Sequence, residues 1–412
     1  MLHVRETSFW HPFADMGAVR SSSLEIVRGE DVWVWSADGT RYLDATASLW
    51  YCNAGHGRAE IADAVAAQMR SLEAYSAFGD LTNGPAEALS RRLADHAPME
   101  DAKVFLASGG GDAIETAAKL ARRFFVETGQ PSRDHLVVRS NGYHGTHGFG
   151  TSLAGIEANR SSWGPLVPDI SIVGKDDLLE LRGVLERESV AAVFVEPVIG
   201  AGGLYPPTAG YIEGAAELCR EYGALFVCDS VICAFGRLGT WFGIERFDVE
   251  PDMITFAKGV TSGYLPLGGL VVAGRVAEPF FAAPGGPMFR HGATYAGHAT
   301  VCAAAMANLD LLEDGLMTRG QELELSLYAA LQALESHDKV AEIRGGTGTL
   351  AAVALDPELG PAAPGRLALA TRANGVLVRA LATGVATSPP LTATPEHFGL
   401  IADAIGAALD EV

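Results

Sequence analysis

The sequence predicts an α/β protein with a large central domain and a smaller α+β domain built from both ends of the chain. Short apolar runs alternate with helical segments through the middle of the chain, which is typical of a mostly parallel central sheet. The two ends have different patterns, described below. We expect residues 1–55 and 301–412 to form the N- and C-terminal parts of the small domain, and residues 56–300 to form the large domain.

Several short runs predict the strands of the central sheet. "KVFLA" (103–107) is followed by a helix from Asp112 to about Glu127, whose acidic first turn and later basic residues suit the helix dipole. Further strands are expected at "HLVVR" (135–139), "AAVFVEP" (191–197), "ALFVCDS" (224–230) and "MITFAK" (253–258), with helices around 176–188 and 208–222. Nearly continuous apolar strands predict a parallel sheet covered on both faces.

The ends of the chain predict the second domain. Residues 24–44 have the pattern of an antiparallel hairpin with a turn at Asp38-Gly39. From about residue 300 onward the chain is rich in helix formers and is interrupted by "GTLAAVAL". The small domain should therefore combine strands and helices.

Composition and charge exclude several classes of function. The chain has 412 residues, 48% of them hydrophobic, which suits a large buried core. Its formal net charge of −20 argues against sequence-independent nucleic-acid binding and against docking on anionic membranes. No apolar run is long enough to span a bilayer.

The termini and the cysteines predict a cytoplasmic protein. The segment "MLHVRETSFWHPFADM" has no basic region followed by an apolar stretch, so no secretory signal is visible. The five cysteines are odd in number and form no C-x-x-C pair. Reduced thiols in the cytoplasm are the simplest interpretation.

The stretch "MITFAKGVTSGYLPLGG" places Lys258 after an apolar run and before a glycine-rich turn. The chain has only five lysines, and arginine supplies most of its positive charge. A desolvated lysine can become a neutral nucleophile, whereas arginine keeps its proton. A solvated surface lysine is the alternative, but the apolar surroundings make Lys258 a candidate catalytic residue.

The stretch "ASGGGDAIETAAKLAR" joins a strand to a helix through Gly109, Gly110 and Gly111. Glycines let backbone N–H groups approach a ligand closely, and a helix N-terminus favours an anion, so the stretch predicts a phosphate site. An ordinary flexible turn is the alternative. A dinucleotide fingerprint does not fit, because its third glycine would fall at Ile114.

Polar residues also follow other predicted strands. Asp229 ends an apolar strand, where a carboxylate is costly without a partner, although Asp is also a common turn residue. In "NGYHGTHG" (141–148), Tyr143 could stack on a planar ligand. His144 and His147 lack the accompanying ligands of a metal centre, so no metal is expected. "RHGATYAGHA" (290–299) offers Thr294 as a hydroxyl donor.

One cofactor requires this combination. Pyridoxal 5'-phosphate (PLP) needs an anion site, a stacking face, an acid for its ring nitrogen and a Schiff-base lysine. The sequence places candidates for all four after successive strands.

The sequence resembles the class III aminotransferases of the fold-type-I PLP-dependent enzymes, and within them the (S)-selective omega-transaminases, or amine–pyruvate aminotransferases. The resemblance rests on stretches that run in the family's order through nearly the whole chain: "FWHPFADM", "YLDATASLWYCNAGHG", "GGGDAIETAAKLAR", "NGYHG", "VEPVIGAGG", "CDSVICAFGRLG", "FAKGVTSGYLPLGG", "ATYAGHA" and "ATSPPLTAT". It implies a homodimeric transaminase that moves an amino group from a primary amine or omega-amino compound to pyruvate or a similar oxo acid.

The resemblance also implies roles for individual residues. Lys258 would be the Schiff-base lysine, and Asp229 would pair with the pyridine nitrogen. The remaining cofactor-binding residues would be Gly110 and Gly111 at the phosphate, Tyr143 and Val231 on the two ring faces, His144 and Glu196 nearby, and Thr294 from the partner subunit.

The substrate pocket would be lined by Trp50, Phe78 and Tyr143, again by resemblance. Arg379, a short way before "SPPL", would be a mobile arginine for the substrate carboxylate. A surface arginine is the alternative interpretation.

Two stretches depart from the family pattern. The family's Ser/Thr-Gly-Ser/Thr at the phosphate is replaced by Gly109-Gly110-Gly111, which removes side-chain hydroxyl groups. The family's Asp-Glu-Val is replaced by Asp229-Ser230-Val231. The alternatives to an amine–pyruvate enzyme are another class III reaction (diaminononanoate, 4-aminobutyrate or beta-alanine transamination) and a non-enzymatic PLP-binding protein.

Overall fold

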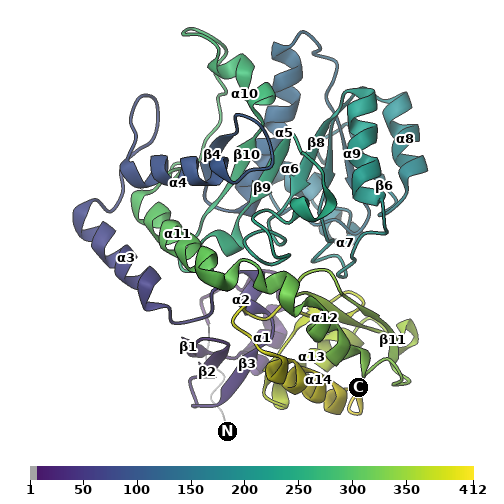
Figure 1. The fold of residues 1–412 in the computed structure, drawn as a ribbon. Coiled ribbons are helices and arrows are strands. Elements are labelled where there is room, and N and C mark those ends of the chain that lie inside the picture. The colour runs from purple at the N-terminus through teal and green to yellow at the C-terminus, as the bar shows by residue number, and fades with distance from the viewer. Residues whose placement is uncertain (1–6) are drawn as a thin grey trace.

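The structure is a computed structural model and describes residues 7–412. Figure 1 shows two bodies, an upper one around a large sheet and a lower one that holds the beginning and the end of the chain. The predicted α/β class, with a mostly parallel central sheet and a smaller α+β part from both termini, is confirmed. The boundaries at 55/56 and 300/301 stay a prediction, and the first range includes residues 1–6, which lie outside the described part.

The central sheet has the strand order β4-β10-β9-β8-β7-β5-β6. Its strands are β4 (Lys103–Ala107), β5 (His135–Arg139), β6 (Ile170–Val173), β7 (Val190–Val195), β8 (Leu225–Asp229), β9 (Met253–Phe256) and β10 (Gly268–Val272). Neighbouring strands from β6 to β9 run parallel, and β10 is antiparallel to both β4 and β9. The strands predicted from "KVFLA", "HLVVR", "AAVFVEP", "ALFVCDS" and "MITFAK" all form.

Neither β6 nor β10 was predicted from the sequence. β10 begins with a pair of glycines that carry little strand signal. The fold explains one of them. A Cβ on Gly268 would lie 2.4 Å from the carbonyl carbon of Gly109, so only glycine lets the two backbones approach this closely.

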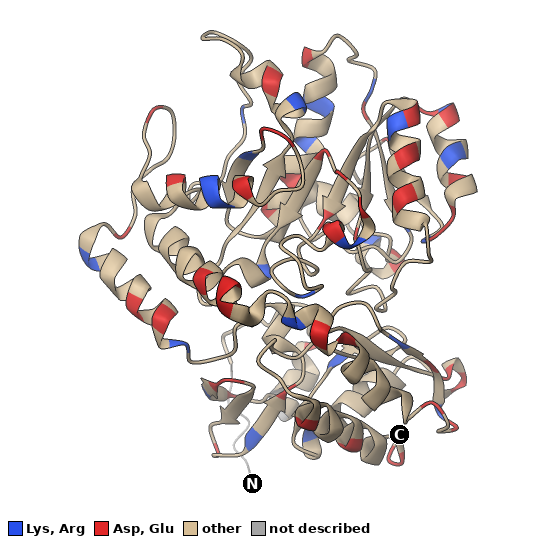
Figure 2. Cartoon of the chain, in the orientation of Figure 1, with Lys and Arg blue, Asp and Glu red and all other residues tan. Residues whose placement is uncertain are grey.

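The alternation of side chains explains why the central strands are apolar throughout. In β7, Val193 and Val195 belong to one hydrophobic cluster, while Ala192 and Phe194 belong to another. Successive residues of a strand point to opposite faces of the sheet, so both faces are buried. Figure 2 shows that most of the charged residues of the upper body lie outside the central strands, while Lys103, Arg139 and Asp229 stand at strand ends.

The upper body also contains helices, several of which connect strands of the central sheet. They are α3 (Ala59–Ser71), α4 (Gly84–Asp95), α5 (Gly110–Glu127), α6 (Gly148–Ser152), α7 (Glu157–Arg160), α8 (Leu178–Arg187), α9 (Tyr211–Tyr222), α10 (Gly274–Phe281) and α11 (Ala299–Leu311), with short turns η1 (Ile244–Phe247) and η2 (Lys258–Val260). The predicted helices match α5, α8 and α9 within a few residues. Each helix within residues 7–412 falls short of the length or apolar character needed to cross a membrane.

The lower body combines two sheets with helices. Its elements are α1 (Met16–Ser22), β1 (Ile26–Glu30), β2 (Trp33–Ser36), β3 (Arg41–Asp44), α2 (Ala47–Trp50), η3 (Leu312–Leu316), α12 (Arg319–Gln332), β11 (Val340–Arg344), β12 (Ala351–Leu355), η4 (Pro357–Leu359), α13 (Ala363–Ala373), β13 (Val376–Leu377), β14 (Arg379–Leu381), β15 (Gly384–Thr387) and α14 (Pro395–Leu409). The predicted hairpin forms between β2 and β3, and β1 adds a strand to it. Because β13 pairs with β3, one sheet joins the two ends of the chain.

The direction of the strands decides where polar residues gather. The parallel strands have their carboxyl ends at one edge of the sheet. Since β10 is antiparallel to β4 and β9, β4 also ends at this edge, and the β9–β10 connection remains there. The segments that follow β4, β5, β7, β8 and β9 therefore meet.

Candidate active site

Lys258 lies in the connection between β9 and β10, at the carboxyl edge of the central sheet. Its φ of 48° is in the left-handed region, which lysine rarely adopts. Such strained backbone concentrates at functional sites. The side chain is only partly exposed and faces a cavity.

The environment of Lys258 favours a neutral amine. Burial lowers the pKa of Lys258, and the negative charges of Asp229 and Glu196 oppose this shift without cancelling it. A lysine with a lowered pKa has more of the unprotonated amine that nucleophilic attack requires. The structure thus gives Lys258 the chemistry expected of a catalytic amine.

Asp229 ends β8 and is 4% exposed. Its Oδ2 lies 2.7 Å from Nδ1 of His144, and its Oδ1 accepts hydrogen bonds from the Thr255 hydroxyl (2.9 Å) and the Val231 N–H (3.2 Å). These partners compensate the cost of burying a carboxylate. They also hold it in one orientation at the cavity.

His144 is the main charge partner of Asp229. Burial alone would lower the pKa of His144, but the hydrogen bond and the negative charge of Asp229 outweigh it, and the pKa is raised. A raised pKa favours the charged imidazolium, which lies 2.7 Å from the Asp229 carboxylate. The two groups form a buried pair at the cavity.

Glu196 follows β7 and orients the loop that carries Tyr143. Its Oε1 accepts the Tyr143 N–H at 3.0 Å, and its Oε2 accepts the Gly200 N–H at 3.0 Å. Burial raises the pKa of Glu196, and the charge of His144 acts against that shift. The carboxyl group joins the segments that follow β5 and β7.

The three glycines lie where β4 meets the N-terminus of α5. Gly109 is the N-cap residue and supplies no side-chain cap, so the first N–H groups of α5 are available to a ligand. A Cβ on Gly110 would lie 3.1 Å from Cγ1 of Val231, which shows how closely the glycine loop approaches the segment after β8. This arrangement is an anion site formed by backbone groups.

These segments enclose one cavity of about 230 Å³. The residues predicted for the cofactor line it together: Gly110, Gly111, Tyr143, His144, Glu196, Asp229, Val231 and Lys258. An anion site, an aromatic ring, a buried carboxylate and an amine with a lowered pKa fit the phosphate, ring, ring nitrogen and aldehyde of PLP. The roles of the individual residues stay proposals.

The comparisons with known proteins agree with this geometry. The family model "Aminotransferase class-III" matches residues 16–409. The chain belongs to the class III aminotransferases. The chain is therefore a PLP-dependent aminotransferase, as the sequence predicted.

Three class III aminotransferase relatives show how far the similarity extends. A putrescine–pyruvate aminotransferase of Pseudomonas aeruginosa is 33% identical over 97% of this chain and 93% of its own. An (S)-enantioselective omega-transaminase from Thermomicrobium roseum has a TM-score of 0.92 at 36% identity, covering 97% of this chain and 96% of its own. An amine transaminase from an uncultivated Pseudomonas species, solved in the PLP-bound form, has a TM-score of 0.93 at 34% identity, with 99% of both chains covered.

Two predicted substrate residues of this class III aminotransferase lie near the cavity. Trp50 is buried, and a Cβ on Gly200 would lie 2.9 Å from its Cζ3 and 2.4 Å from Cδ1 of Ile232, a cavity residue. Arg379 is exposed on β14 and does not line the cavity. Its positive charge nevertheless has an electrostatic effect on Tyr143. Burial raises the pKa of Tyr143, while the charge of Arg379 opposes this rise.

The other two predicted residues lie outside the cavity of their own chain. Phe78, in the α3–α4 connection, is 53% exposed, and Thr294 is also exposed. A Cβ on Gly292 would lie 3.6 Å from Cζ of Phe78. The loop of Thr294 therefore packs beside Phe78, and neither residue lines the cavity.

The role of Thr255 was not predicted from the sequence. His147 was considered only as a metal ligand and was rejected as one. Thr255 donates its hydroxyl hydrogen to Asp229, and the one signal for this role was a hydroxyl group inside an otherwise apolar strand. His147 lines the cavity beside Gly111. No sequence pattern indicates that contact, because it joins two separate loops.

Proposed function

We propose that this aminotransferase moves an amino group from a primary amine or omega-amino compound to pyruvate or a similar oxo acid. The observation that carries the choice of substrates is the position of Arg379. Its charge acts on Tyr143, which lines the cavity, although the Arg379 side chain is exposed. A cation held at the rim can pair with an acceptor carboxylate and remain in water while an uncharged donor group binds, which avoids a buried unpaired charge.

The residues of the site have separate tasks in this proposal. PLP supplies an electron sink for the bond that breaks at the substrate carbon. Asp229, held by His144 and Thr255, would pair with the ring nitrogen. The Lys258 amine, whose lowered pKa leaves it able to accept a proton, would take the proton from the substrate carbon and return it later in the reaction.

We also propose that the active protein is a homodimer with shared active sites. Phe78 and the loop of Thr294 lie together, exposed, and outside the cavity of their own chain. This supports a contribution of both residues to the site of a partner subunit. Sedimentation of the purified protein tests the dimer, and a monomer with full activity would contradict it.

A panel of donors tests the reaction class. We expect turnover with 1-phenylethylamine and pyruvate, measured as acetophenone formation. Preferential turnover of diaminononanoate, 4-aminobutyrate or beta-alanine would favour another class III reaction. No turnover with any donor, despite bound PLP, would favour a non-enzymatic PLP-binding protein.

A further inference from the structure

The His147 ring lies against the first turn of α5. A Cβ built on Gly111 would be 3.2 Å from both Cε1 and Nε2 of His147. This distance is shorter than nearly all such contacts in proteins, so a side chain at position 111 would require the imidazole to move. The absence of a side chain at Gly111 thus gives the imidazole room at the N-terminus of the helix.

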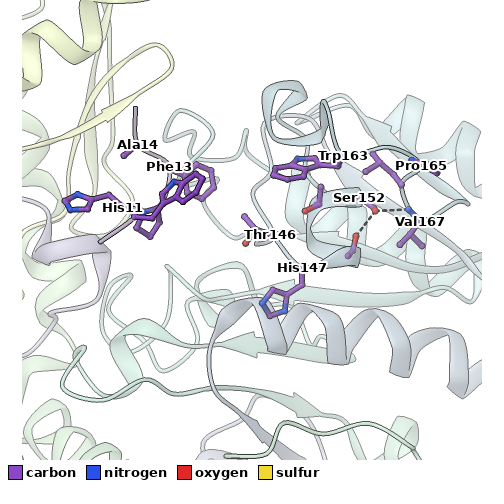
Figure 3. Close-up of a pocket in the computed structure, with 14 residues that line it drawn as sticks. His11, Phe13, Ala14, Thr146, His147, Ser152, Trp163, Pro165 and Val167 are labelled. Carbon is purple, nitrogen blue, oxygen red and sulfur yellow. Dashed lines mark hydrogen bonds between the residues drawn. The ribbon is translucent and has the colours of Figure 1, made fainter. Parts of the chain in front are cut away.

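The ring lies at the boundary of two cavities. His147 lines the cofactor cavity together with Gly110, Gly111 and Lys258. It also lines a larger neighbouring cavity of about 880 Å³, where Figure 3 shows its ring directed away from Phe13 and Trp163. Its side chain is 49% exposed. The imidazole is thus accessible to a ligand at the glycine loop.

Asp112 orients the ring. Its Oδ1 lies 3.6 Å from Nδ1 of His147, while Nε2 is on the side of Gly111. With a hydrogen on each nitrogen, the ring can donate from Nδ1 toward Asp112 and from Nε2 on the side of Gly111. The Nε2–H can then serve as a donor at the helix N-terminus.

We propose that His147 binds the phosphate of PLP and provides the side-chain donor that Gly109-Gly110-Gly111 lacks. The backbone N–H groups of α5 would bind the phosphate from one side, and Nε2–H of His147 would bind it from the loop after β5. A hydrogen bond from a ring N–H to a phosphate is charge-assisted, because the acceptor is ionised, and is stronger than a hydrogen bond between neutral groups. This inference rests on the proposed cofactor site.

Two ligands separate a phosphate contact from a general disturbance of the site. Apoenzyme is titrated with PLP and with pyridoxal, which lacks the phosphate, and the dissociation constants are measured by absorbance. His147→Ala should raise the dissociation constant for PLP about tenfold, the order expected for one charge-assisted hydrogen bond. The constant for pyridoxal should remain within about twofold of the wild-type value.

Further variants test whether the ring acts as a donor. His147→Phe keeps an aromatic ring beside Gly111 without an N–H group, so it should weaken PLP binding as much as His147→Ala. Gly111→Ser combined with His147→Ala places a hydroxyl where the ring was and should recover part of the affinity. His337→Ala, which removes a histidine beside two carboxylates in the lower body, is the matched control and should leave both constants unchanged.

Each outcome decides for or against the proposal. An unchanged PLP constant in His147→Ala, equal weakening of PLP and pyridoxal, or wild-type affinity in His147→Phe would overturn it. In these cases the proposed function stands as long as the wild type attaches PLP at Lys258. A wild type that attaches no PLP at Lys258 would overturn the proposed function and this inference together.

Discussion

The carboxyl edge of the central sheet and the exposed loops around it form two different parts of the site. At the edge, Asp229 and Glu196 are buried, each with at least two polar partners. Around the edge, Phe78 and Thr294 in loops and Arg379 on β14 are exposed and outside the cavity. One chain thus brings together the residues proposed for the cofactor ring, whereas Phe78, Thr294 and Arg379, which are proposed for the substrate and the phosphate, are exposed to solvent.

This difference suggests that two kinds of physical constraint act on the enzyme. Buried charges are tolerated only with partners in fixed geometry, so we expect the residues proposed for the cofactor ring to form a rigid network. Exposed residues carry no such requirement and can respond to a partner subunit or to a substrate. We therefore expect substitutions at the edge to affect every substrate, and substitutions in the loops to affect particular steps.

The largest effect is expected from Lys258→Ala. The change removes the amine that attaches the cofactor and transfers the proton, so turnover should fall below detection with every donor and acceptor. Borohydride reduction followed by mass spectrometry of peptides measures the attachment. Reducible attachment of PLP at another lysine in the variant would remove Lys258 from its proposed role.

Asp229→Asn should slow the chemical step about ten- to a hundredfold, since a charge-assisted hydrogen bond contributes roughly 1.5–3 kcal/mol. Asparagine keeps the shape but cannot stabilise a positive ring nitrogen. PLP should still bind. Single-turnover kinetics measure the effect, and both half-reactions should slow alike. Rates equal to those of the wild type would contradict the proposed role.

Arg379→Ala should slow only the half-reaction with pyruvate, also by about one to two orders of magnitude. The half-reaction with a carboxylate-free amine should change little, because that donor offers no partner for the guanidinium. Stopped-flow absorbance can follow each half-reaction separately. If both half-reactions slow equally, or if neither slows, Arg379 lies outside the substrate site. The distinction between the sheet edge and the exposed segments around it would then be weaker.

Thr294→Ala should have the smallest effect, a severalfold rise in the dissociation constant of PLP. The melting temperature at a given PLP concentration should fall as well, because bound ligand stabilises the protein by mass action. Differential scanning fluorimetry across PLP concentrations measures both. If His147 and Thr294 both bind the phosphate, the double variant should lose more affinity than either single variant. An unchanged constant for Thr294→Ala would exclude this threonine.

The sequence predicted those elements whose signal is local. β7, β8 and β9 are runs of apolar residues, and the helix after Gly111 has an acidic first turn. Residues that follow parallel strands meet at one edge, so the meeting of Asp229 and Lys258 could be expected as well. The strand β10 could not be predicted, because its glycines are explained by a close approach to Gly109, which is distant in the sequence.

The sequence by itself determined the family, the cofactor and five strands of the central sheet. The tertiary structure decided which residues meet. His144 and Thr255 bind Asp229, the charge of Arg379 acts on Tyr143, and the His147 ring lies beside Gly111. The physical reason is that strand and helix signals come from the periodicity of neighbouring residues, whereas a contact between two loops depends on the direction and register of the strands that carry them.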